Sequence, residues 1–160
     1  MKHTAIVLRI ALLVFALCAA TFAASSLSAQ GRKMHATGTF DVKLVPQADT
    51  DSAVGRMTID KVFHGDIEGT SKGMMLASMS PSQPTSGAYV ALEKVTGTVH
   101  GKKGTFALHH VGLMDRGAQS LTVMVVPDSG TDDLIGIAGT LKIIIDGKKH
   151  SYEFDYTLPK

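Results

Sequence analysis

Ionisable side chains stand at positions where the alternation of residues calls for apolar ones. His110 is in phase with Phe106 and Leu108. Lys61 is in phase with Ile59 and Phe63. Residues two apart in a strand lie on the same face, so an imidazole and an ammonium would each share an apolar surface. An apolar pocket with a few converging polar groups is the usual form of a small-molecule site, and burial shifts pKa values toward acid–base work.

A carboxylate and three phenols follow the same pattern. Glu93 is in phase with Tyr89, and Tyr152 and Tyr156 are in phase with Phe154. If these faces line an interior, carboxylate, imidazole, ammonium and phenol groups meet among apolar walls. The expected ligand-binding residues are Tyr89, Glu93, His110, Tyr156 and Lys61. Two of them, Glu93 and His110, are the candidates for acid–base catalysis.

Other interpretations of these residues remain open. A buried histidine such as His110 can simply be a hydrogen-bonded core residue. Lys61 and Glu93 can lie outside, because the strand that holds Glu93 also carries Val90 and Leu92 on its opposite face. That second apolar face would suit contact with another copy of the chain.

Motifs with stricter requirements do not support a metal or nucleophile site. Residues 69–73 spell G-x-S-x-G, but a nucleophile elbow needs a helix after the serine, and here the stretch has the pattern of a strand. His109 and His110 are adjacent, so on a strand they point to opposite faces. His64 and His100 would form at most half a site, and the acidic loop 128–133 lacks EF-hand spacing. We therefore expect no metal and no cofactor.

The elements that must position these residues are strands. After residue 33, apolar and polar residues alternate and glycine-rich turns recur, with no sustained helical period. Eight strands with hairpin-length connections predict an all-β, closed eight-stranded antiparallel barrel of lipocalin-like shape, because closure removes both free edges. A two-sheet sandwich is the alternative. The expected strands are residues 34–45, 54–64, 67–79, 88–99, 105–114, 120–126, 140–146 and 150–158, and the loop 127–139 has room for one short helical turn.

The first 29 residues have the pattern of a cleavable signal peptide. A basic start at Lys2 precedes an apolar run over residues 5–24, and small residues lead to Ala29. The alternatives are an uncleaved membrane anchor and a lipid-modified Cys18. We expect a signal peptide over residues 1–29, a single barrel domain over residues 30–160, and a periplasmic or secreted protein.

Composition excludes several classes of function. Cys18 is the only cysteine, so the domain that follows has no disulfide and no thiolate chemistry. The chain has 16 Lys and Arg against 14 Asp and Glu, and Lys2 and Arg9 belong to the leader, so the domain is balanced in charge. A nucleic-acid-binding domain would keep a basic surplus. We expect no nucleic-acid partner and no membrane contact after cleavage.

Long stretches of the chain resemble a known bacterial family. They are "GRMTIDKVFHGDIEGTSKG" (55–73), "GAYVALEKVTGTVHGKKGTFALHH" (87–110) and "SLTVMVVPDSGTDDLIGIAGTLKIIIDGKKHSYEFDYTLP" (120–159). The sequence is similar to domain of unknown function 3224 over about residues 35–159. The resemblance implies a fold like the allene oxide cyclase barrel, and no activity. Cyclases of that architecture use a buried carboxylate, a phenol and an asparagine-held water. Glu93 and Tyr89 match the first two, but the chain has no asparagine.

Three hypotheses for function follow. The first is a barrel that binds a small apolar molecule in its lumen, and the second is a cofactor-free isomerase or cyclase with Glu93 or His110 as acid or base. The third is a non-catalytic structural or assembly protein that uses its outer apolar face, with a homo-oligomer as its expected form. The residues leave turnover undecided and favour binding.

Overall fold

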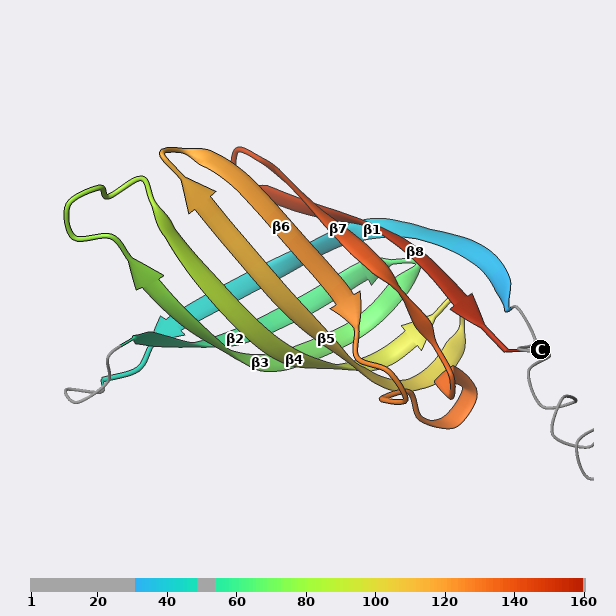
Figure 1. Ribbon diagram of the computed structural model, residues 1–160. Coiled ribbons are helices and arrows are strands. Elements are labelled where there is room, and N and C mark those ends of the chain that lie inside the picture. The colour runs from blue at the N-terminus through green and yellow to red at the C-terminus, as the bar shows by residue number, and fades with distance from the viewer. Residues whose placement is uncertain (1–30, 49–53, 160) are drawn as a thin grey trace, which may run out of the picture. The chain divides into compact units, whose positions relative to one another are not determined.

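The protein folds into a closed antiparallel barrel of eight strands (Figure 1). The computed structural model describes residues 31–48 and 54–159. Each strand pairs with the next along the chain, and β8 pairs with β1, so the closed barrel is confirmed and the two-sheet sandwich does not form. The strands are β1 (Arg32–Pro46), β2 (Gly55–Gly65), β3 (Ile67–Met79), β4 (Gly87–Val99), β5 (Lys102–Asp115), β6 (Ala118–Val125), β7 (Ala138–Asp146) and β8 (Lys149–Leu158). The expected signal peptide, residues 1–29, lies outside the described residues.

Tight turns make consecutive strands neighbours. His100 and Gly101 have φ of 46° and 76°, and Arg116 and Gly117 have φ of 49° and 91°. Two-residue hairpin turns of type I′ have positive φ at both central residues, and their twist matches that of the flanking strands. Glycine adopts this backbone without strain, so these two glycines fit the turns that connect β4 to β5 and β5 to β6.

One end of the barrel is filled and covered, and we call it the capped end. The loop from β6 to β7 contains a single 3-10 turn, η1 (Asp132–Leu134), in agreement with the expected helical turn. Two residues of this loop, Leu134 and Ile137, are buried. The loop is also held to β5, because the Thr131 N–H donates to the Thr105 carbonyl at 2.9 Å. Below it, Phe106 and Phe154 belong to the main hydrophobic cluster. Apolar packing therefore closes this end.

The opposite end, which we call the open end, holds inward-facing side chains that water reaches. Leu44, Leu121 and Ile145 continue the inward-facing alternation of β1, β6 and β7, yet they are 47%, 41% and 63% exposed. The β3–β4, β5–β6 and β7–β8 connections lie at this end, together with the last residues of β1 and the first residues of β2. The two ends of the lumen thus differ, and the open end offers inward apolar surface to a ligand.

The wall is not uniform around the barrel. The ladder between β3 and β4 runs the full length of both strands, whereas β6 and β7 share the single pair Met124–Thr140.

None of the helical segments in the described part of the chain is long and apolar enough to cross a membrane.

Candidate functional site

Four polar side chains from neighbouring strands meet inside the barrel. The Lys61 ammonium, from β2, donates to Glu93 Oε1, on β4, at 2.7 Å. His110 Nε2, from β5, lies 3.2 Å from the same oxygen. The Ser71 hydroxyl, from β3, donates to Glu93 Oε2 at 3.1 Å. Three of the predicted site residues therefore converge, with the Glu93 carboxylate at their centre.

This cluster is almost completely removed from water. Lys61, Ser71, Glu93 and His110 are each at most 6% exposed. Burial raises the pKa of Glu93, but the hydrogen bonds and charges of His110 and Lys61 outweigh burial, so its pKa lies below the ordinary value of 4.5. The carboxylate is therefore ionised at neutral pH. The Lys61 ammonium also lies 4.9 Å from the centre of the Phe40 ring, which adds a cation–π contact.

Glycines facing the lumen make room for these side chains. A Cβ at Gly73, which pairs with Glu93 across β3 and β4, would lie 2.6 Å from the Glu93 Cβ. A Cβ at Gly112 would enter the ring of Tyr89, which pairs with it across β4 and β5. Close approach of a side chain explains why these inward positions have none of their own.

Two polar atoms beside the cluster have no hydrogen-bond partner in the described part of the chain. His110 uses Nε2 toward the Glu93 carboxylate, and no partner meets its Nδ1. The Tyr89 hydroxyl is also without a partner, and burial, followed by the charge of Glu93, raises the pKa of this phenol. Among the described residues, no fully buried side-chain nitrogen or oxygen lacks a partner. Both atoms therefore reach accessible space. The Glu93 carboxylate only accepts, so Nε2 donates to it, and in a neutral imidazole Nδ1 then carries the lone pair.

Sequence reasoning missed Ser71. The G-x-S-x-G stretch does lie within a strand, β3, as expected, with no helix after it. Yet Ser71 is 2% exposed and bonds to the central carboxylate. Its alternation with Ile67 was the available signal, but the two glycines beside it hid which face of the strand is inward.

Tyr156 does not join the Glu93 cluster. Its hydroxyl lies 2.8 Å from Nδ1 of His100, at the capped end. The other ring nitrogen of His100 lies 3.6 Å from Asp66. Burial, followed by the Asp66 charge, raises the pKa of Tyr156. The predicted ligand-binding residues thus divide into three in the cluster, Tyr89 toward the open end of β4, and Tyr156 at the capped end.

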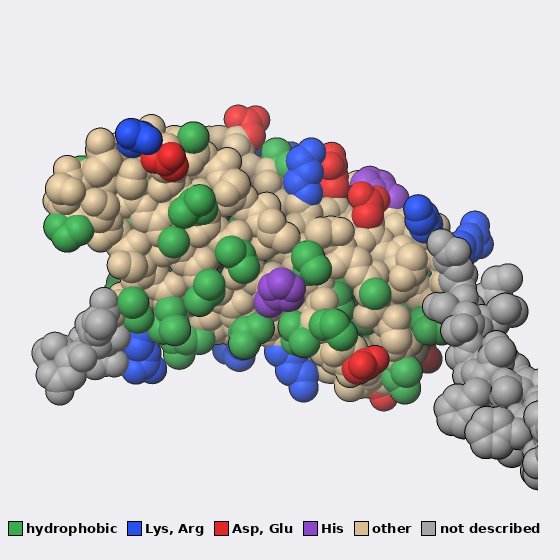
Figure 2. All heavy atoms as spheres, in the orientation of Figure 1, with side chains coloured by type: hydrophobic (Ala, Val, Ile, Leu, Met, Phe, Trp, Pro, Cys, Tyr) green, Lys and Arg blue, Asp and Glu red, His purple; other side chains and the backbone are tan. Residues whose placement is uncertain are grey.

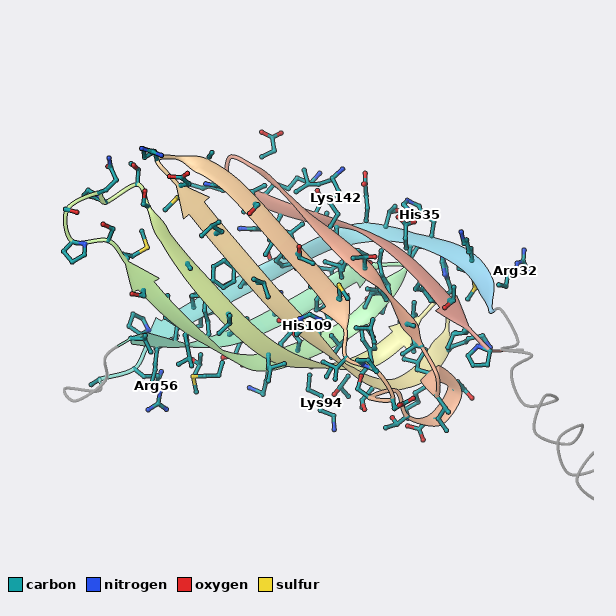
Figure 3. The ribbon with its side chains drawn as sticks, in the orientation of Figure 1. Arg32, His35, Arg56, Lys94, His109 and Lys142 are labelled. Atoms are coloured by element: carbon teal, nitrogen blue, oxygen red, sulfur yellow. The ribbon has the colours of Figure 1, made fainter. Side chains whose placement is uncertain are left out.

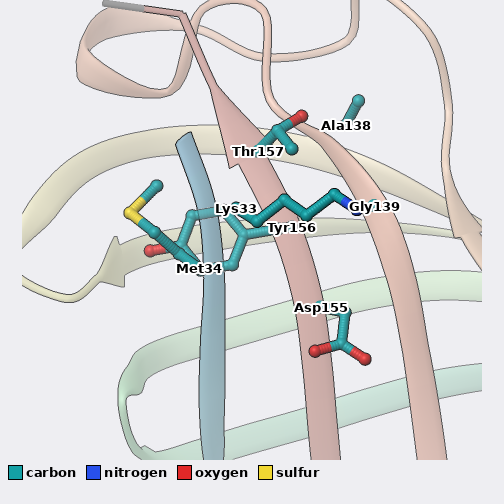
Figure 4. A pocket seen from close by; sticks show the side chains of 7 residues that line it. All are labelled: Lys33, Met34, Ala138, Gly139, Asp155, Tyr156 and Thr157. Atoms are coloured by element: carbon teal, nitrogen blue, oxygen red, sulfur yellow. The ribbon is translucent and has the colours of Figure 1, made fainter. Parts of the chain in front are cut away.

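Tyr156 also borders a pocket of about 410 Å³ between β1, β7 and β8 (Figure 4). Lys33 and Asp155 stand at its polar side, and Met34 and Gly139 complete its wall. No described residue of the Glu93 cluster lines this pocket, so the two features are separate.

The described residues contain no group of three or more His, Cys, Asp or Glu side chains placed to hold a metal ion. His64 lies 3.6 Å from Asp41 on the neighbouring strand, while His100 faces Asp66 and Tyr156. His64 and His100 therefore have separate partners and do not form half a metal site with each other.

Comparison with known proteins agrees with the fold. Residues 36–156 match the family described as "Protein of unknown function (DUF3224)". The barrel is similar to the crystal structure of a protein of unknown function from the DUF3224 family of Shewanella oneidensis MR-1. That protein is 39% identical, with a TM-score of 0.75, and the match covers 81% of this chain and 100% of that chain. No curated protein matches the chain. By its sequence and its fold, the chain belongs to the DUF3224 family.

Proposed function

We propose that the open end of the barrel binds a small apolar molecule that carries one uncharged hydrogen-bonding group. The observation that supports this proposal is that two accessible polar atoms, His110 Nδ1 and the Tyr89 hydroxyl, have no hydrogen-bond partner among the described residues, in a largely apolar interior. An orphan polar atom next to apolar walls is the arrangement by which a pocket orients a ligand.

The walls above the cluster suit an apolar ligand of variable shape. Met57 and Met75 are paired across β2 and β3, and both are half-buried on the inward face. Met114 stands at the same end of β5. Methionine is flexible and polarisable, so it adapts to ligands of different outline. Together with Leu121 and Ile145, these side chains would surround the apolar body of the ligand.

The charges of the cluster favour an uncharged head group. The Glu93 carboxylate is already matched by Lys61 and bonded by Ser71 and His110. A second anion would be repelled by the Glu93 carboxylate and would meet the lone pair of a neutral His110 at Nδ1. A cation would find no free counter-charge, because Glu93 is already paired with Lys61, and burial of an unpaired charge in an apolar site is costly. A hydroxyl can donate to Nδ1 and can accept from the Tyr89 hydroxyl, so an alcohol has the hydrogen-bonding groups that suit both atoms.

The test is titration with the fluorescent probe N-phenyl-1-naphthylamine, followed by displacement with 1-decanol or decanoate. We expect one saturable site per barrel and stronger displacement by the alcohol. In Tyr89→Phe the alcohol loses about threefold to tenfold in affinity, the worth of one hydrogen bond. Leu121→Lys places a charge on the inward wall and weakens the probe by about tenfold or more.

Val62→Lys is the matched control, because Val62 is exposed on the outer face of β2 and 44% accessible. It should bind the probe as the wild type does. Absence of saturable probe binding, or equal loss in Val62→Lys and Leu121→Lys, would refute a lumen site.

A second candidate is proton transfer inside the same lumen. A histidine that donates from one nitrogen to a carboxylate holds its other nitrogen ready as a base, as in hydrolytic triads. His110 Nδ1 would take a proton from a carbon beside a carbonyl and return a solvent proton to the same or a conjugated carbon. This isomerisation needs no oxidant or cofactor, and Lys61 supplies positive charge nearby.

Proton transfer predicts that 2-decanone incubated with the protein in D2O gains deuterium beside its carbonyl. His110→Gln should lose this exchange while it retains binding of the fluorescent probe. Binding without any exchange in the wild type would leave the protein as a binder alone.

We also propose that the barrel acts in the periplasm or outside the cell, on the basis of the signal-peptide pattern of residues 1–29. Fractionation of the cells that make the protein, with N-terminal sequencing, tests this. The expected exported form begins at Gln30, and an uncleaved cytoplasmic chain would contradict it.

A further inference from the structure

The outer surface of the barrel has an apolar area that the lumen does not explain. Side chains of β3 to β6 that point away from the lumen are large, apolar and exposed (Figure 2). We call this surface the outer apolar face. It consists of Met74, Leu76, Val90, Leu92, Val111, Leu113 and Met124, which are between 37% and 61% exposed.

Strand pairing makes this face continuous. Met74 pairs with Leu92 across β3 and β4. Leu92 pairs with His109 across β4 and β5, and His109 pairs with Met124 across β5 and β6. A second row runs beside the first, from Leu76 through Val90 to Val111 and Thr122. Figure 3 places His109 on the wall formed by these strands.

Charged residues lie at the border of the outer apolar face and not within it. Lys72 and Lys94 pair with each other across β3 and β4, one row beyond Met74 and Leu92. Lys72 also bonds to Asp60 at 2.7 Å. Within the described rows the face holds no Asp, Glu, Lys or Arg, which is the pattern of an interface with an apolar centre and a polar rim.

The area of the face matches what a protein–protein contact needs. Seven large side chains at these exposures leave on the order of 600 Å² of apolar surface in water, which is the upper end of what a soluble monomer shows. With Ala88, His109 and Thr122 between them, the surface approaches the roughly 800 Å² that each partner buries in a standard complex.

We propose that the outer apolar face binds a second copy of this chain, forming a dimer by face-to-face contact of β3 to β6. A two-fold dimer covers the same face on both copies and leaves none exposed. Positive and negative residues balance from residue 30 onward, so two copies meet without net repulsion. The proposal does not depend on the function proposed for the lumen.

The test is the mass in solution of the exported protein, measured by sedimentation velocity over a range of concentrations. We expect a dimer for the wild type. Val111→Lys places like charges opposite one another in the contact and should raise the dimer Kd more than about a hundredfold. Leu92→Lys, on the neighbouring strand, should do the same.

Val62→Lys is again the matched control, since Val62 is an outward valine of similar exposure two rows away from the face. It should stay dimeric. Thermal unfolding by circular dichroism checks that the variants are folded, as expected for changes at exposed positions. A wild-type monomer at every concentration would overturn the proposal, as would a dimer that survives both Val111→Lys and Leu92→Lys. A monomer that floats with phosphatidylcholine vesicles would overturn it in favour of a membrane contact.

Discussion

At the scale of single residues, Glu93 is the centre of the barrel's polar chemistry. Its two oxygens accept from Lys61, His110 and Ser71 in a place that water scarcely reaches. A buried ion pair adds little net stability, because desolvation of both charges opposes their attraction, but loss of one partner leaves the other charge unmatched. The cluster therefore fixes the positions of His110 and Lys61 more than it stabilises the fold.

Glu93→Gln should lower the free energy of unfolding at pH 7 by about 3 kcal/mol, because the buried amine of Lys61 loses the carboxylate that pairs with it. Urea unfolding measures this directly. Lys61→Met in the Glu93→Gln background removes the unmatched ammonium and should recover most of the loss. Additive losses in the double variant would show that the ammonium and the carboxylate act independently.

Tyr152 joins the capped end to the backbone of β3. Its hydroxyl accepts from the buried Ile67 N–H at 2.7 Å. Burial is the main cause that raises the pKa of Tyr152 to about 12 from 10.0, and the charges of Asp66 and Glu68 add to it. Ionisation of this phenol would thus require the folded protein to hold an unfavourable buried charge.

The raised pKa of Tyr152 makes stability depend on alkaline pH. The stabilisation is fully present below pH 10.0, the unfolded value, and disappears as pH rises toward 12, the folded value. Tyr152→Phe should cost about 1–3 kcal/mol at pH 7, because the Ile67 N–H is left unpaired. Between pH 10 and 12 the difference in the free energy of unfolding between the wild type and Tyr152→Phe should become smaller. Chemical denaturation at each pH measures this difference. A difference that stays constant over this range would contradict the assignment.

At the scale of elements, the alternation of residues predicted which strands exist and which side chains share a face. It did so because one face of each strand is buried and the other is exposed to solvent. Alternation alone could not decide which face is inward in β4, where Val90 and Leu92 are outward and exposed. Alternation also does not show how far along the barrel axis a residue lies. For this reason it groups Tyr156 with Glu93, although Tyr156 lies at the capped end.

Gly112 shows how one element limits another. Because Tyr89 lies against its α-carbon, Gly112→Ala should displace the phenol and lower the free energy of unfolding by about 1–3 kcal/mol, the usual cost of overpacking. Thermal unfolding and displacement of the fluorescent probe by 1-decanol both measure the effect. Gly55→Ala is the control, because its nearest neighbour would lie at 3.6 Å, an ordinary contact. Equal effects of the two substitutions would refute the role of Tyr89.

At the scale of the whole barrel, three surfaces have different tasks. The capped end supplies the packed core, and the open end presents inward apolar side chains above the Glu93 cluster. The outer apolar face lies on β3 to β6, whose ladders are continuous, and it reaches the weakly paired boundary of β6 and β7 at Met124. A rigid wall suits a permanent contact, because its side chains are already ordered before association.

We propose above all that the lumen holds a small molecule through His110 and Tyr89. Native mass spectrometry of the exported protein, purified gently from the cells that make it, tests this most directly. We predict a reproducible added mass that persists in His109→Ala, whose side chain lies on the outer face, and is lost in His110→Ala and Tyr89→Phe. A bare protein mass, unchanged after incubation with extract of the same cells, would contradict the claim.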